Sequence, residues 1–104
     1  REMAMIGILT EEGKDKMIGV GRLIIEPNGT TGEFAVVVGD PWQGQGLGEK
    51  LTDAMIGVAE DKELVTIYGI IAKDNYRMLG LCKKLGFTIE KEGPDTMRAT
   101  LRLR

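Results

Sequence analysis

The chain has 104 residues, which fits a single domain over residues 1–104, and its composition of 42% hydrophobic and 29% charged residues is that of a globular protein. Its formal net charge of −2 provides no overall attraction to nucleic acid, and no apolar stretch is long enough to span a bilayer. We therefore expect neither a nucleic-acid partner nor a membrane partner.

The residue types that the chain lacks exclude several kinds of catalytic site. It contains no histidine and no serine, so a Ser-His-Asp or Cys-His nucleophile has no base. Its one cysteine, Cys82, leaves too few ligands for a zinc site and has no partner for an internal disulfide. We expect no metal, and the lack of a disulfide fits a reducing compartment, which suggests a cytoplasmic protein.

The first part of the chain predicts three strands joined by polar turns. The apolar run Met3 to Leu9 has no helix cap and predicts a strand, which a polar turn over residues 11–16 follows. Met17 to Ile25 is rich in branched aliphatic residues and predicts a second strand, which ends before the turn signal Pro27-Asn28-Gly29. The third strand, Glu33 to Val38, is apolar after its first residue, which suggests burial on both faces.

The second part of the chain predicts two helices. From Leu47 to Lys62 the apolar residues recur at i, i+4, i+7, i+8 and i+11, which is one face of a helix, and Leu64 to Ile71 is an apolar strand. A second helix runs from an N-cap at Asn75 to Gly86, where glycine suits a left-handed stop.

A short strand over residues 87–89 and a final strand over residues 97–103 complete the order β-β-β-α-β-α-β-β. Apolar residues alternate with arginines in the final strand, which suggests a solvated face. The first three strands can run antiparallel, whereas the third strand, first helix and fourth strand form a parallel crossover unit. We therefore predict an α/β fold with a mixed, mostly antiparallel sheet around a central parallel pair.

The most informative segment lies between the third strand and the first helix, Gln43-Gly44-Gln45-Gly46-Leu47-Gly48. Its glycines let the backbone approach a ligand, and the helix start behind it presents unpaired N–H groups that suit a phosphate. A Walker A loop needs a second glycine five residues after its first, but Glu49 stands five residues after Gly44, and Leu51 stands five residues after Gly46. A dinucleotide fingerprint needs its third glycine one place after Gly48, where Glu49 stands. A tight strand-to-helix turn without a ligand is the alternative.

The spacing that remains, Q-x-x-G-x-G over residues 43–48, resembles the acyl-CoA pyrophosphate loop of the GNAT acyltransferases. The run from Val36 to Gly48 is similar to motif A of that family. Asn75 together with residues 81–87 is similar to its motif B, N-x-x-x-x-x-L-x-x-K-L-G-F. The resemblance covers residues 3–103 and implies a GNAT fold, truncated at its N-terminus, in which the central parallel strands splay apart.

A narrower resemblance is to the bacterial Pat-type protein lysine acetyltransferases, in which the acyltransferase domain is fused to a domain like an acyl-CoA synthetase. It rests on residues 1–4, 33–36 and 75–79. Because the chain begins with Arg1 and lacks the family's usual N-terminal strand and first helices, we expect a fragment of a longer protein, to which such a synthetase-like domain could be linked.

The resemblance implies acetyl-CoA as co-substrate. Pantetheine amides would pair with the splayed third strand, at the backbone of Val36, Val37 and Val38. The pyrophosphate would lie on the N–H groups of the glycine-rich turn, which are those of Gln43, Gly44, Gln45, Gly46, Leu47 and Gly48. Asn75 could contact the cofactor besides capping its helix, and the 3′-phosphate could be reached by Lys50, Arg77 or Lys84.

In the family an amine attacks the thioester directly in a ternary complex. A lysine amine has a reference pKa of about 10.4, so a carboxylate base would raise its reactive fraction. Glu33 is our candidate for this base, with a solvated strand end as the alternative. Many GNAT enzymes carry a tyrosine as general acid five residues before the phenylalanine of G-F, where this chain has Cys82. The Cys82 thiol could donate a proton or could pack as a small apolar residue.

These expectations lead to three candidate functions. The leading one is transfer of an acetyl group from acetyl-CoA to a protein lysine. The second is the same chemistry on a small amine. The third, from a different class, is an acyl-CoA-binding regulatory module without turnover.

Overall fold

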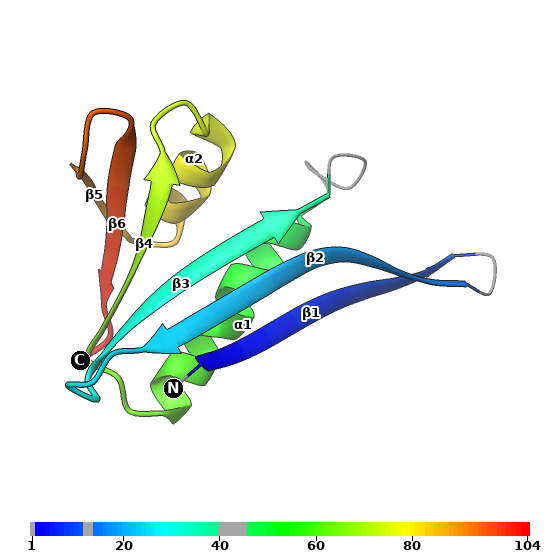
Figure 1. The fold of residues 1–104 in the computed structure, drawn as a ribbon, viewed down its shortest axis with the longest axis horizontal. Coiled ribbons are helices and arrows are strands. Elements are labelled where there is room, and N and C mark those ends of the chain that lie inside the picture. Colours follow the sequence, from blue (N-terminus) through cyan, green and yellow to red (C-terminus); the bar gives the residue numbers. More distant parts are fainter. Residues whose placement is uncertain (1, 12–13, 40–45) are drawn as a thin grey trace.

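The computed structural model describes residues 2–11, 14–39 and 46–104, and it describes side chains from Gly19 onward within these ranges. The described part contains two helices and six strands in the predicted order β-β-β-α-β-α-β-β, which is confirmed (Figure 1). Their bounds are β1 Glu2–Glu11, β2 Lys14–Ile25, β3 Thr31–Val38, α1 Leu47–Asp61, β4 Thr66–Ala72, α2 Tyr76–Lys84, β5 Thr88–Lys91 and β6 Thr96–Arg102.

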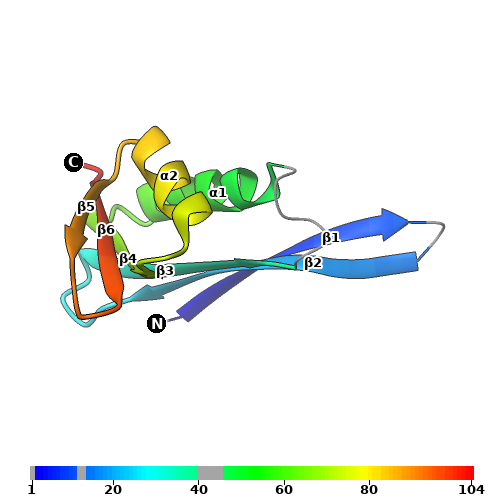
Figure 2. The ribbon, with the colours of Figure 1, turned by 90° about the horizontal axis from the view of Figure 1, so that it is seen from above.

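The six strands form one mixed sheet in the order β1-β2-β3-β4-β6-β5. The β3–β4 pair is parallel and the other four pairs are antiparallel, as the crossover argument predicts. Figure 2 shows that α1 and α2 both lie against the same face of the sheet. Neither described helix is long and apolar enough to cross a lipid bilayer.

The hydrophobic core lies between this face and the helices. Apolar side chains of β2, β3, β4 and β6 meet those of α1 and α2 there, and the buried cluster is Leu23, Phe34, Met55, Ala59, Leu64, Ile67, Ile71, Cys82, Phe87 and Ala99. Because side chains alternate along a strand, every second residue of each strand is directed to the helix-free face.

Two sequence expectations about the strands are wrong. The turn over residues 11–16 is shorter than predicted, because β1 and β2 remain paired as far as Glu11 and Lys14. β3 is not buried on both faces either: Ala35 is exposed, and the Val37 side chain is 68% exposed. No described element covers the face opposite the helices, so apolar residues at alternate positions of β3 stay accessible.

The helix ends follow the local sequence signals. The Oδ1 atom of Asn75 accepts a hydrogen bond from the Met78 backbone N–H at 3.2 Å, which confirms the N-cap of α2. Gly86 adopts φ of 98° after the last turn, where a side chain would be strained, so the predicted left-handed stop is confirmed as well.

The parallel pair β3–β4 is short. Only three residue pairs join the two strands, from Thr31↔Thr66 to Glu33↔Tyr68. Beyond that point β3 stays paired with β2 as far as Val38, and β4 stays paired with β6 as far as Ala72. The sheet therefore divides into two halves that diverge in a V, as Figure 1 shows, and the predicted splay is confirmed.

The ring of Phe34 fills the position at which the parallel pairing stops. Phe34 and Gly69 would form the next pair in the register, but the Phe34 ring lies over Gly69, where an added Cβ would be 2.7 Å from Cζ. The ring also packs against Phe87, with the two ring centroids 5.4 Å apart. Gly69 thus provides the room that the ring needs at the opening of the V.

We expect Gly69→Ala to lower the free energy of unfolding by about 1–3 kcal/mol, because the new methyl group would overlap the Phe34 ring. Gly80→Ala is a matched control in α2, where an added Cβ meets nothing within 4 Å and alanine is the better helix former. Urea unfolding followed by circular dichroism measures both variants. A Gly69→Ala protein as stable as the wild type would contradict the packing described.

Candidate active site

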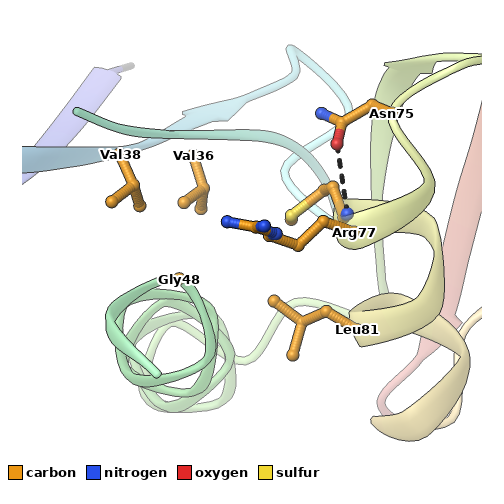
Figure 3. Close-up of a pocket in the computed structure, with 7 residues that line it drawn as sticks. Val36, Val38, Gly48, Asn75, Arg77 and Leu81 are labelled. Carbon is orange, nitrogen blue, oxygen red and sulfur yellow. Dashed lines mark hydrogen bonds between the residues drawn. The ribbon is translucent and has the colours of Figure 1, made fainter. Parts of the chain in front are cut away.

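A pocket of about 100 Å³ opens between the two diverging halves of the sheet. β3, α1 and α2 supply its lining, and the lining residues are Val36, Val38, Gly48, Asn75, Arg77, Met78 and Leu81. Figure 3 shows Val36 and Val38 directed from β3 toward α1, with Arg77 and Leu81 entering from α2. The structure thus brings together residues from motif A and motif B that lie almost forty positions apart.

The floor of this pocket is the start of α1. Gly46 is the N-cap residue, with φ of 82° and no side-chain cap hydrogen bond. An added Cβ at Gly48 would lie 3.7 Å from Leu81 and 3.8 Å from Val38, which is ordinary van der Waals contact, so a methyl group here would fit but would occupy space between these two residues. A helix start without a side-chain cap can offer its first N–H groups to an anion. The predicted contacts Gln43, Gly44 and Gln45 lie outside the described residues.

The three basic candidates for a phosphate contact lie in different surroundings. Arg77 lines the pocket. Lys84 pairs with Glu49 at 2.9 Å, which joins the end of α2 to the start of α1, and its side chain is 67% exposed. Lys50 is exposed and does not line the pocket. The position of Arg77 favours it among the three.

A cluster of polar side chains lies where β3 and β4 part. Glu33 and Tyr68 are the last pair of the parallel ladder, and the Tyr68 hydroxyl is 3.5 Å from Glu33 Oε1. The same hydroxyl donates a hydrogen bond of 2.5 Å to Glu26 Oε2. The Tyr68 side chain is only 9% exposed, whereas Glu33 is half-buried. Two carboxylates from β3 and the end of β2 thus flank one buried phenol.

The phenol of Tyr68 stays neutral at physiological pH. Its hydrogen bond to Glu26, its burial and the charges of Glu33 and Glu26 raise its pKa to about 12, although Arg98 acts in the opposite direction. The Arg98 guanidinium carbon lies 3.8 Å from the centroid of the Tyr68 ring. Arg98 also pairs with Glu92 at 3.5 Å, and its side chain is still 38% exposed, so this arginine remains partly solvated while it lies over the Tyr68 ring.

A protein-family model matches most of this chain. The model of the acetyltransferase (GNAT) family matches residues 2–87. The chain belongs to the GNAT family. The resemblance predicted from motifs A and B is therefore confirmed at the level of the family.

Several GNAT relatives share much of this chain. Acetyltransferase PA5475 from Pseudomonas aeruginosa is 28% identical over 103 residues, which are 99% of this chain and 55% of that protein. The chain therefore spans about half the length of this curated relative. The YncA structure from Salmonella typhimurium, described as an acetyltransferase with its cofactor acetyl-CoA, is 26% identical with a TM-score of 0.75 and covers 85% of this chain and 59% of that one.

Two more distant structures support the GNAT fold alone. A domain from Methanocaldococcus jannaschii has a TM-score of 0.85 at 18% identity, covering 98% of this chain and 67% of that one. A spermidine N-acetyltransferase SpeG chimera from Vibrio cholerae and hSSAT has a TM-score of 0.78 at 21% identity, covering 97% and 66%. The likeness extends over both halves of the V.

In this GNAT domain, Cys82 lies apart from the pocket. Its side chain is 0% exposed and belongs to the hydrophobic core, and burial raises the pKa of its thiol to about 11. It does not line the pocket. The structure thus favours the packing alternative for Cys82 over the role of general acid.

The sequence analysis did not single out Tyr68 and Glu26, which lie beside the candidate base Glu33. Tyr68 is the one aromatic residue in the strand-like run Leu64 to Ile71, and a buried tyrosine usually needs a partner for its hydroxyl. That signal was present, but nothing in the sequence identified Glu26 as the partner, 42 positions away. In the described part of the chain, no group of three or more potential ligands is arranged to hold a metal ion.

We expect iodoacetamide to alkylate Cys82 slowly in the folded protein. Because the thiolate is the reactive form, the rate should rise about tenfold per pH unit until the pH approaches the raised pKa of about 11. Unfolding in urea should restore the rate of a free thiol. Mass spectrometry of the alkylated chain measures this, and fast labelling of the folded protein at pH 7 would contradict the burial.

Proposed function

We propose that this GNAT domain transfers an acetyl group from acetyl-CoA to an amine. The observation that carries the proposal is the V between β3 and β4, with a pocket that opens onto the start of α1. A strand whose free edge faces a pocket can pair with an extended amide chain, and pantetheine is such a chain. A helix start beside the same pocket suits the diphosphate of the coenzyme.

Different residues of the pocket would bind different parts of the coenzyme. The backbone of Val36 to Val38 would bind the pantetheine amides, because this stretch lies beyond Glu33↔Tyr68, the last pair of the β3–β4 ladder. Gly46, Leu47 and Gly48 would bind the diphosphate through their N–H groups, together with the preceding turn. Asn75 lines the pocket and already caps α2 through Oδ1, which leaves its amide N–H group for a cofactor contact.

Glu33 is the proposed base. It ends the parallel ladder at the apex of the V, and its side chain alternates with that of the buried Phe34, so it is directed to the helix-free face. An acceptor amine that approaches from that face would lose a proton to Glu33 and attack the thioester carbonyl. The carbon–sulfur bond then breaks, and the CoA thiolate leaves and takes up a proton.

A protein lysine is the proposed acceptor. No described element covers the sheet face to which Glu33 is directed, and an open face can receive a side chain from a large partner. The segment from Glu33 to Val36, which carries part of the resemblance to the Pat-type lysine acetyltransferases, runs from the end of the parallel ladder into the opened part of β3. We extend the proposal to that relationship and to its synthetase-like fusion. A small amine is the alternative acceptor, which the same assay tests.

Glu33→Gln tests the base directly. We expect kcat to fall by about 100-fold or more at pH 7, because the amide cannot accept the proton from the amine. Binding of acetyl-CoA, followed through the backbone amide signals of Gly46 and Gly48, should be unchanged. The assay measures release of CoA thiol with polylysine or spermidine as acceptor.

Glu90→Gln is the matched control for this assay, since Glu90 is exposed on β5 away from the V. It should retain the wild-type kcat. Equal activity of Glu33→Gln and Glu90→Gln would contradict the assignment of the base. Binding of acetyl-CoA without turnover of either acceptor by the wild type would favour the regulatory module.

Arg77→Ala tests the contact to the 3′-phosphate. We expect it to weaken acetyl-CoA binding by about tenfold and to leave binding of 3′-dephospho-acetyl-CoA unchanged, because a charge-assisted hydrogen bond to the phosphate is lost only in the first case. Lys84→Ala, whose lysine pairs with Glu49, serves as the control. Isothermal titration with both ligands measures the difference. Equal weakening for both ligands would contradict the phosphate contact.

A further inference from the structure

The hydroxyl of Tyr68 lies between two carboxylates. It donates its single proton to Glu26 Oε2 at 2.5 Å, and its oxygen is 3.5 Å from Glu33 Oε1. A hydroxyl can donate one hydrogen bond and accept two, so the lone pairs of Tyr68 remain available on the side of Glu33. Glu26 at the end of β2, Tyr68 of β4 and Glu33 of β3 thus lie in one row, with the Tyr68 hydroxyl in the middle.

The proposed reaction, on which this inference rests, needs an outlet for protons. A protonated amine loses two protons when it becomes an amide. The leaving thiolate takes up one of them, and the other must reach solvent. Glu33 can accept only one proton at a time, so it must release that proton before the next turnover.

We infer that Tyr68 relays the acceptor's proton from Glu33 to Glu26. The amine N–H bond breaks and an O–H bond forms on Glu33. Glu33 then donates this proton to Tyr68 Oη while the original hydroxyl proton of Tyr68 moves to Glu26 Oε2. The net result is a protonated Glu26, a neutral Tyr68 and a Glu33 carboxylate that is ready for the next amine.

The surroundings of Tyr68 suit a relay through the neutral phenol. Glu33, Glu26 and Arg98 are the charged groups that act on it, and Glu92 pairs with Arg98. A phenol with a pKa near 12 does not ionise at neutral pH and so keeps the hydroxyl proton that the relay requires. The contact from Glu33 needs to shorten from 3.5 Å, and catalytic hydrogen bonds often tighten when the substrate binds.

A route to solvent begins at Glu26. A second cavity, of about 380 Å³, is lined by Ile25, Glu26, Pro27, Gly29, Lys62 and Leu64. It shares no lining residue with the pocket of Val36 and Arg77. A proton on Glu26 can therefore leave without passing through the space proposed for the coenzyme.

Tyr68→Phe and Glu26→Gln each interrupt the relay and leave Glu33 in place. With acetyl-CoA and polylysine or spermidine, we expect each to lower kcat at pH 7 by about 10- to 100-fold without changing the KM for acetyl-CoA. The loss should shrink toward pH 10, where the acceptor amine arrives unprotonated. The double variant should be no slower than either single one, because both changes interrupt the same path.

The solvent isotope effect separates a relay from a structural role. In D₂O the wild type should show a larger effect on kcat than Tyr68→Phe, since more than one proton is in transit. Tyr76→Phe is the matched control, because Tyr76 is the other tyrosine of the chain and is 78% exposed. The kcat of this variant should equal that of the wild type. Glu26→Gln keeps the shape of the side chain and tests the relay even where Tyr68→Phe folds poorly.

The outcomes distinguish the relay from the function itself. If Glu33→Gln abolishes turnover while Tyr68→Phe and Glu26→Gln keep the wild-type kcat at pH 7, the relay is wrong and the proposed function stands. A rise in the KM for acetyl-CoA with an unchanged kcat in Tyr68→Phe would also overturn the relay, since Tyr68 would then act in binding alone. If the wild type turns over neither acceptor, the proposed function is wrong and the relay with it.

Discussion

The structure depends on a parallel strand pair that stops after three residues. In an uninterrupted sheet, β3 and β4 would satisfy each other's backbone along their whole length, and no pocket could open between them. Here the Phe34 ring lies over Gly69 at the fourth position, and each strand continues with its outer neighbour only. After this early end, β3 stays paired with β2 and β4 stays paired with β6, so each strand is held in its own half of the sheet. The opening between the two strands is therefore part of the ordered fold.

One strand can serve two sides of a reaction because side chains alternate along it. On β3, Val36 and Val38 are directed to the helices and line the pocket proposed for the coenzyme. Glu33 is directed to the other face, where no described element lies over the sheet. The proposed donor and acceptor would thus meet at the apex of the V from opposite faces, which keeps the coenzyme away from the bulk of a large acceptor.

The proton chemistry that we propose for this domain lies on strands rather than on the second helix. The helix position where many family members carry a tyrosine is Cys82, a core residue whose thiol has a raised pKa. The chain instead has a buried phenol at Tyr68, held between two carboxylates and under the guanidinium of Arg98. Because a buried hydroxyl is costly unless it is hydrogen-bonded, Glu26 contributes to stability as well as to the relay that we infer.

The sequence by itself determined what local chemistry controls: the element order, the Asn75 cap, the Gly86 stop and the family, through glycine spacing at one helix start. It led to two wrong expectations, burial of β3 on both faces and a long turn over residues 11–16, because both depend on how the strands pair and on what covers the sheet. Only the tertiary structure paired Tyr68 with Glu26 and Glu33 and brought Arg77 to the pocket. These contacts join residues from separate elements, and their partners depend on strand register and helix packing, which no local pattern specifies.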